Sequence, residues 1–76
     1  MKKTSKSSKQ NFVYIDFRDL EALIRDCEEG IVLVNPMQLM MLETYYGNMK
    51  YNEDLNIMEV LVDKNFLDLL EGRRII

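Results

Sequence analysis

The most regular pattern of apolar and polar positions lies between residues 16 and 30. Its apolar members recur at spacings of three and four: Phe17, Leu20, Leu23, Ile24 and Cys27. This spacing places them on one face of an α-helix. Asp16 precedes the run as a candidate N-cap, and Gly30 follows it as a C-terminal stop. We therefore expect an amphipathic helix whose buried face is centred on Leu23 and Ile24.

Three further segments have the pattern of β-strands. Residues 11–17 alternate between two faces and are rich in β-branched and aromatic side chains. Residues 31–34 are a continuous apolar run, which predicts a short strand covered on both faces. Residues 55–62 alternate again, and we expect them to form the central strand. Residues 47–54 are expected to form a loop, and residues 73–76 either add an edge strand or dock on a partner.

Helix boundary signals mark two more helices. Asn35 is a good N-cap and Pro36 suits the first helical position, so a helix is predicted from Pro36 to about Tyr46. Residues 65–72 form a short amphipathic segment that ends in a glycine. The order strand, helix, strand, helix, strand, short helix predicts an α+β fold. We expect a small mixed sheet of about three strands, with two to three helices packed on one face.

The composition is typical of one small folded domain. The 76 residues are 47% hydrophobic, with a single cysteine and no histidine. These counts exclude an intrachain disulfide and a Cys/His zinc site, and we expect neither cofactor nor metal. No stretch approaches the length of a membrane span. We therefore expect a cytoplasmic protein with a reduced Cys27, in which residues 11–76 form a single domain behind a disordered basic arm, residues 1–10.

The residue types needed for most catalytic sites are missing. Without histidine there is no catalytic triad and no imidazole base, and the glycines stand singly at helix ends instead of forming a phosphate loop. Adjacent carboxylates occur at Glu28/Glu29 and Glu53/Asp54, but a chain this short has little room for a deep pocket. Cys27 continues an apolar helix face and is expected to pack as a small hydrophobic residue. We expect a protein that is not an enzyme.

The predicted helix from Pro36 to Tyr46 is unusual because apolar side chains occupy nearly its whole circumference. Such a helix is buried on more than one side. Either it forms the centre of the monomer core, or a second molecule covers its outer side, and we expect a homodimer or another protein partner there. Glu28 and Glu29 either form a solvated, solubilising helix end or add an acidic patch suited to a basic partner. The candidate partner-binding residues are Met37, Met40, Met41, Tyr45, Tyr46, Glu28 and Glu29.

Charge is divided unequally along the chain. Residues 1–10 carry four lysines and no acidic residue, whereas residues 11–76 carry six basic and thirteen acidic side chains, a net charge of −7. Our first hypothesis is a small protein-interaction module that regulates or inhibits a larger protein. The short length and the lack of catalytic groups also suit a phage or mobile-element (viral) protein. The alternative is a DNA-binding transcriptional regulator that contacts phosphate through its basic arm. The residues for that alternative are Lys2, Lys3, Lys6 and Lys9.

Overall fold

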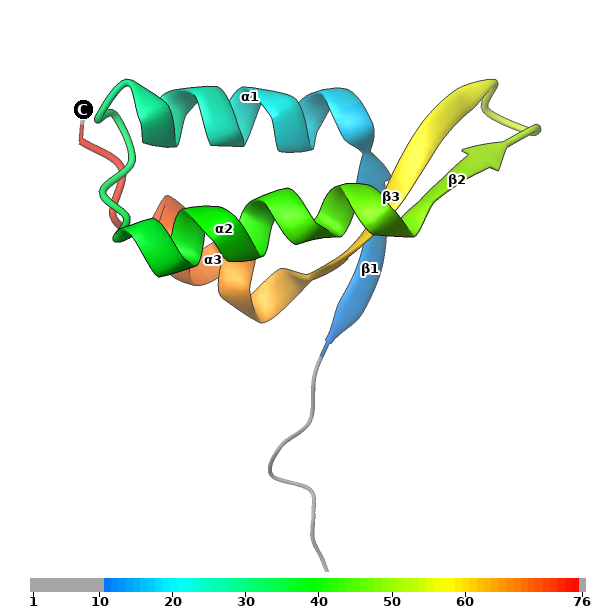
Figure 1. The fold of residues 1–76 in the computed structure, drawn as a ribbon. Helices are drawn as coiled ribbons and strands as arrows, with labels where there is room; N and C mark the ends of the chain where they lie inside the picture. Colours follow the sequence, from blue (N-terminus) through cyan, green and yellow to red (C-terminus); the bar gives the residue numbers. More distant parts are fainter. Residues whose placement is uncertain (1–10, 76) are drawn as a thin grey trace, which may run out of the picture.

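The computed structural model describes residues 11–75, so the predicted basic arm lies outside the described residues. Three strands and three α-helices follow one another along the chain (Figure 1). In order they are β1 (Phe12–Asp16), α1 (Phe17–Glu28), α2 (Pro36–Thr44), the 3₁₀ helix η2 (Tyr45–Asn48), β2 (Met49–Asn52), β3 (Ile57–Asp63) and α3 (Lys64–Glu71). The predicted α+β class is confirmed.

The three strands form one sheet in the order β1-β3-β2. Both pairs are antiparallel: Ile15 of β1 lies opposite Val60, and Tyr51 of β2 lies opposite Met58. The segment predicted as the central strand therefore occupies the centre of the sheet as β3. The expected mixed sheet is corrected in one respect, because all its pairs are antiparallel. A single turn, residues 53–56, joins β2 to β3, so this pair needs no crossover.

The core lies between one face of the sheet and the helices. Val60 and Val62 project from that face of β3 and are completely buried. Side chains from every helix meet them there, and Figure 1 shows the three helices gathered on the same side of the sheet. The buried residues are Leu20, Leu23, Ile24, Cys27, Val32, Leu42, Val60, Val62 and Leu70. The predicted helices on one face are thus confirmed.

Helix α1 begins and ends as its sequence predicts. The Asp16 carboxylate accepts a hydrogen bond from the Arg18 backbone N–H at 2.9 Å, which caps the helix. The Arg18 guanidinium also donates to this carboxylate and, with the capping bond, lowers the pKa of Asp16. After the helix the backbone reverses at Gly30, whose φ of +81° is favourable only for glycine.

The predicted strand at residues 31–34 is wrong. Only Val32 pairs, in an isolated antiparallel bridge to Arg74 near the C-terminus. The Ile75 N–H donates a hydrogen bond to the Ile31 carbonyl at 2.7 Å, which joins the same two segments. Val32 is buried but Leu33 is exposed, so the apolar run covers the end of the core without entering the sheet. For residues 73–75, this bridge is found instead of an edge strand, and the alternative of docking on a partner stays a prediction.

Arg74 also links the end of α3 to α1. Its guanidinium lies 2.8 Å from an Asp26 carboxylate oxygen and 2.8 Å from a Glu71 carboxylate oxygen. Because Arg74 donates hydrogen bonds to Glu71, the pKa of that carboxyl group is lowered. The two ion pairs hold the last turn of α3 beside the last turns of α1.

The predicted loop at residues 47–54 is also wrong, because it contains β2. Met49 and Tyr51 pair with residues of β3, which supplies hydrogen-bonding partners that the local sequence does not reveal. The following turn places Asn56 at a φ of +57°, a left-handed conformation that asparagine tolerates better than most residues. Asn52 supports this turn by accepting a hydrogen bond from the Leu55 N–H at 3.1 Å.

The buried face of α1 predicts a large loss of stability on truncation. Leu23 is 6% exposed, so Leu23→Ala should lower the free energy of unfolding by about 2–5 kcal/mol. The matched control is Leu69→Ala on α3, where the leucine is 50% exposed and the change should cost under about 1 kcal/mol. Urea unfolding followed by circular dichroism measures both, and equal losses would contradict the assigned core.

The Arg74–Glu71 pair predicts a pH dependence. A carboxyl group whose pKa is lower in the folded state stabilises the fold above its unfolded pKa, and this contribution is lost as the pH falls through the folded pKa. An NMR titration should show Glu71 titrating below the usual range of an exposed glutamate. Arg74→Gln should return the Glu71 pKa to that range. An unchanged titration in this variant would show that the pair does not persist in solution.

Candidate functional site

Helix α2 is positioned by the capping signals that its sequence carries. The Asn35 side chain accepts a hydrogen bond from the Gln38 N–H at 2.8 Å, and the Gln38 side chain accepts one from the Asn35 N–H at 3.1 Å. This reciprocal pair is a capping box, and Pro36 begins the helix as predicted. Leu42 is completely buried and Leu39 packs against the core beside it. These two leucines define the inward face of α2.

The opposite face of α2 is covered by nothing in the described structure. Met37, Met40 and Met41 are 71%, 64% and 45% exposed. At about 100° per residue their spacing of three and four places them in one stripe, on the side of the helix opposite Leu39 and Leu42. We call these three residues the methionine face. The chain thus brings three of the predicted partner-binding residues onto one surface.

The two predicted tyrosines separate to different sides of α2. The Tyr45 ring packs edge-on against Phe66 of α3, with 6.5 Å between ring centroids, and its hydroxyl oxygen accepts a hydrogen bond from the Asp63 N–H. It is half-buried and belongs mainly to the fold. Tyr46 is exposed on the side of α2 that faces α1.

Acidic side chains from two helices act electrostatically on Tyr46. Burial raises the pKa of its hydroxyl group, and the nearby carboxylates of Glu21, Glu28 and Glu43 raise it further. Glu21 and Glu28 come from α1, whereas Glu43 comes from α2. Predicted residue Glu28 therefore joins this group, while Glu29 caps the end of α1 through its backbone N–H, which donates to the Arg25 carbonyl at 2.9 Å.

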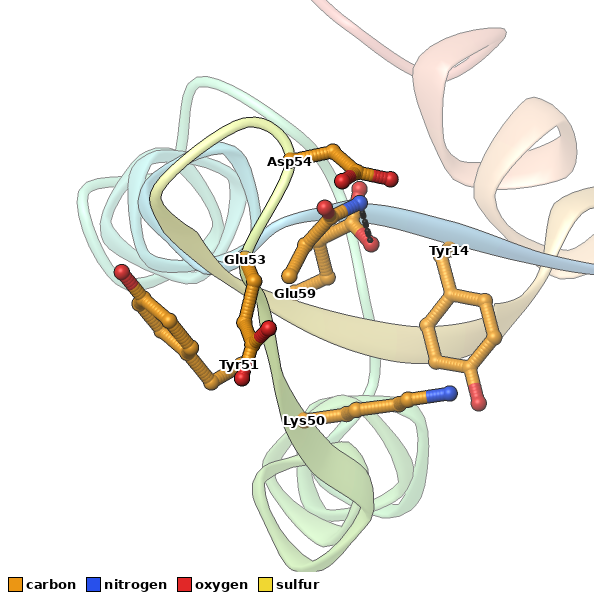
Figure 2. Close-up of a pocket in the computed structure, with 7 residues that line it drawn as sticks. Tyr14, Lys50, Tyr51, Glu53, Asp54 and Glu59 are labelled. Atoms are coloured by element: carbon orange, nitrogen blue, oxygen red, sulfur yellow. Dashed lines mark hydrogen bonds between the residues drawn. The ribbon is translucent and has the colours of Figure 1, made fainter.

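The second surface feature is an open hollow on the uncovered face of the sheet (Figure 2). Its volume is about 440 Å³. Lys50 lies with its ammonium group 5.6 Å from the centre of the Tyr14 ring, a cation–π distance. Asn52 donates a hydrogen bond to Glu59 at 3.0 Å. The lining residues are Tyr14, Lys50, Tyr51, Asn52, Glu53, Asp54 and Glu59.

This hollow was not predicted from the sequence, although a signal was present. Lys50 and Glu59 lie opposite each other across β2 and β3, so they share the uncovered face with Tyr14 of β1. The alternation of apolar and polar residues in Met49–Asn52 is the pattern that could have identified β2. The hollow is shallow and polar, and Lys50 and Glu59 already have partners within it. It is a weaker candidate than the methionine face.

The described residues offer little for reaction chemistry. Across residues 11–75, no three histidine, cysteine, aspartate or glutamate side chains are grouped so that they could hold a metal ion. Cys27 is buried in the core, and burial together with the carboxylate of Asp26 raises the pKa of its thiol. A raised pKa keeps the thiol protonated, which is the unreactive form. Among these residues, no helix is long and apolar enough to cross a bilayer.

The lysines of the nucleic-acid alternative, Lys2, Lys3, Lys6 and Lys9, lie outside the described residues. Comparison of the chain with protein-family models, curated proteins and solved structures finds no match in any of the three. Proposals about function therefore depend on the surfaces described above.

The environment of Cys27 predicts slow thiol chemistry. In the native protein at neutral pH, a thiol reagent such as dithionitrobenzoate should modify Cys27 at least about tenfold more slowly than in the urea-unfolded chain, because the thiol is buried and protonated. Absorbance of the released thiolate measures both rates. Equal rates would mean that Cys27 is accessible and that α1 does not pack as described.

Proposed function

We propose that this protein is a non-enzymatic protein-interaction module that binds a larger protein and regulates or inhibits it. The contact surface in this proposal is the methionine face of α2. The observation that carries the proposal is the exposure of Met37, Met40 and Met41 in one stripe, on a helix whose opposite side already completes the core. Folding does not require these methionines to be apolar, because they are not buried by it.

The chemistry of the methionine face suits binding. Methionine is unbranched and polarizable, so it adapts to partners of different shape. The stripe contains no charged side chain, so covering it requires no desolvation of an ion. An exposed apolar surface of this kind is typical of interaction sites in small soluble proteins. A binding role is preferred to catalysis because the chain has no histidine and its one thiol is buried.

A second copy of the chain is another candidate occupant of this face. An uncharged stripe can pack against its own copy, which favours the homodimer expected from the sequence. Sedimentation of the protein alone tests that case. A single species of 9.0 kDa at high micromolar concentration would eliminate the homodimer and leave the methionine face for a different chain.

The alternative function, DNA binding, depends on lysines outside the described residues. The chain from residue 11 onward carries a net charge of −7, which opposes phosphate binding. Retention on DNA that falls steeply with salt would favour this alternative over protein binding.

Charge placed on the methionine face should separate binding from folding. Met40 is 64% exposed, so Met40→Glu should change the free energy of unfolding by under about 1 kcal/mol. In a complex the same charge must be desolvated, which costs several kcal/mol. Met40→Glu should therefore abolish binding of the partner. Leu69→Glu on α3 is the matched control, because Leu69 is also exposed and lies away from this face.

Site-specific photo-crosslinking in the native host detects the complex. A photoreactive residue at position 40 should link the protein to one discrete partner chain, whereas the same residue at position 69 should not. The Met37→Glu change should remove the link from position 40. Equal labelling from both positions, or none from position 40, would contradict the proposed contact surface.

A further inference from the structure

Strand β1, drawn in blue in Figure 1, is an edge of the sheet. Sheet edges present unpaired backbone groups, and proteins usually protect them with lysine, proline, a bulge or a very short strand. The other edge strand, β2, is four residues long and contains Lys50. β1 pairs with β3 in one continuous register and has no lysine or proline. Its single charge, Asp16, is paired with Arg18, so β1 is the less protected edge.

Two hydrogen bonds show which backbone groups of β1 face away from β3. The Lys64 N–H donates to the Asn11 carbonyl of the β1 side at 2.8 Å. The preceding N–H, that of Asp63, points the other way and donates to the Tyr45 hydroxyl at 3.4 Å. Bonded and non-bonded pairs alternate along an antiparallel ladder. Asp63 and its register partner Phe12 are therefore a non-hydrogen-bonded pair.

The same alternation leaves three residues of β1 with backbone groups on the free edge. Phe12, Tyr14 and Asp16 do not bond to β3, so their N–H groups project outward. The carbonyl groups of Phe12 and Tyr14 project outward as well, whereas that of Asp16, the N-cap residue, belongs to α1. Among residues 11–75, no backbone group outside the sheet bonds to Phe12 or Tyr14.

The core is also incompletely covered at β1. Val13 and Ile15 lie opposite Val62 and Val60 in the register, and all four side chains point to the core side of the sheet. The two valines of β3 are completely buried, but Val13 and Ile15 are only half-buried. The apolar layer of the core therefore reaches the free edge and is partly exposed there.

We infer that the free edge of β1 binds β1 of a second copy of this chain, antiparallel and related by a two-fold axis at Tyr14. In this register the Tyr14 N–H donates to the partner's Tyr14 carbonyl, and the Asp16 N–H donates to the partner's Phe12 carbonyl. Each bond occurs twice because of the symmetry. The two three-stranded sheets become one continuous sheet. This interface is separate from the methionine face, so the inference does not depend on the proposed function.

The side chains of β1 match those of a second copy in this register. On the core side, Val13 lies opposite the partner's Ile15, so the two half-exposed apolar layers cover each other. On the other face, Asp16 lies opposite the partner's Phe12, which keeps the two Asp16 carboxylates apart. The free edge is therefore complementary to itself in backbone bonds, in apolar contact and in charge.

The distribution of charge around β1 favours the same occupant. In an antiparallel pair, the start of β1 in one copy lies beside the end of β1 in the other. Residues 1–10, with four lysines and no acidic residue, join the chain at the start of β1. Asp16 ends β1, and Asp19 lies in the first turn of α1. Each basic segment is thus attached beside the acidic helix start of the partner.

Sedimentation equilibrium of the full chain tests the dimer, whose mass is twice 9.0 kDa. Tyr14→Pro removes the N–H that faces the partner and should raise the dissociation constant of the dimer at least about tenfold. Proline is tolerated on an edge strand where the N–H faces outward, and a melting curve checks the fold. Tyr14→Thr removes the same ring but keeps the N–H, so it should weaken the dimer at most severalfold. Tyr14→Lys keeps the N–H but places like charges together at the axis, and it should also weaken the dimer more than Tyr14→Thr.

Cysteine crosslinking tests the register. In the paired strands, the Cα atoms at position 14 of the two copies are about 5.5 Å apart, a distance that a disulfide can span. Phe12→Cys is the matched control, because the two copies of position 12 are offset by four residues, or about 13 Å. Under oxidation by copper phenanthroline, Tyr14→Cys should form a covalent dimer and Phe12→Cys should not. The buried Cys27 is common to both variants.

The outcomes separate this interface from the methionine face. Met40→Glu should leave the dissociation constant of the dimer unchanged. A dimer that is lost in Met40→Glu but kept in Tyr14→Pro would place the contact on α2 and overturn the inference. A monomer at high micromolar concentration, equal dissociation constants for Tyr14→Pro and Tyr14→Thr, or equal crosslinking from positions 12 and 14 would also overturn it. If the dimer forms through β1 but position 40 crosslinks to no host protein, the inference stands and the proposed function fails.

Discussion

The structure depends on covering one face of β3. Val60 and Val62 are completely buried, and β3 is the central strand, so both edge strands are held in place by it. Each helix contributes a side chain to the same contact, including Leu20 from α1, Leu42 from α2 and Leu70 from α3. Because a chain of this size can build only one core, the opposite face of the sheet is left to solvent.

This one-sided core also explains why the outer side of α2 is exposed. The helix lies on the outside of the core and uses Leu39 and Leu42 to close it. No further layer of the described chain reaches its other side. On the uncovered sheet face, the Lys50 ammonium group forms a cation–π contact with the Tyr14 ring. The side chains of the methionine face are exposed and have no comparable contact within the described chain. The two open surfaces are therefore not equivalent, and the apolar one is better suited to a protein partner.

Sequence patterns predicted the features that are determined locally. The period of α1, its Asp16 cap and the Asn35–Pro36 start of α2 all require only neighbouring residues, and each was found. The errors at residues 31–34 and 47–54 have a non-local cause, although at 47–54 the short alternation of Met49–Asn52 was also overlooked. Val32 pairs with Arg74, which lies near the other end of the described chain. Residues 49–52 form β2 because they pair with residues of β3. Neither partner can be identified from the apolar content of the segment itself.

The candidate site was partly predictable for the same reason. An all-round apolar helix indicated that α2 has a second surface, but Met40 and Leu42 have similar hydrophobicity, and only the placement of α2 decides which one faces outward. The electrostatic effect of carboxylates from two helices on Tyr46 was less accessible still. Glu21 and Glu43 are distant in sequence and come together only because α1 and α2 pack side by side. Glu28 was identified from its local charge alone.

The division of α2 into two faces gives the protein a simple link between binding and stability. The inward leucines contribute to folding, and the outward methionines are free to contact another chain without rearrangement of the core. A partner that binds only the folded form stabilises it by mass action, by about 2.7 kcal/mol when its concentration is a hundred times its Kd. For a small domain this is a substantial fraction of the total free energy of unfolding. Occupancy of the methionine face would therefore also lower the unfolded fraction.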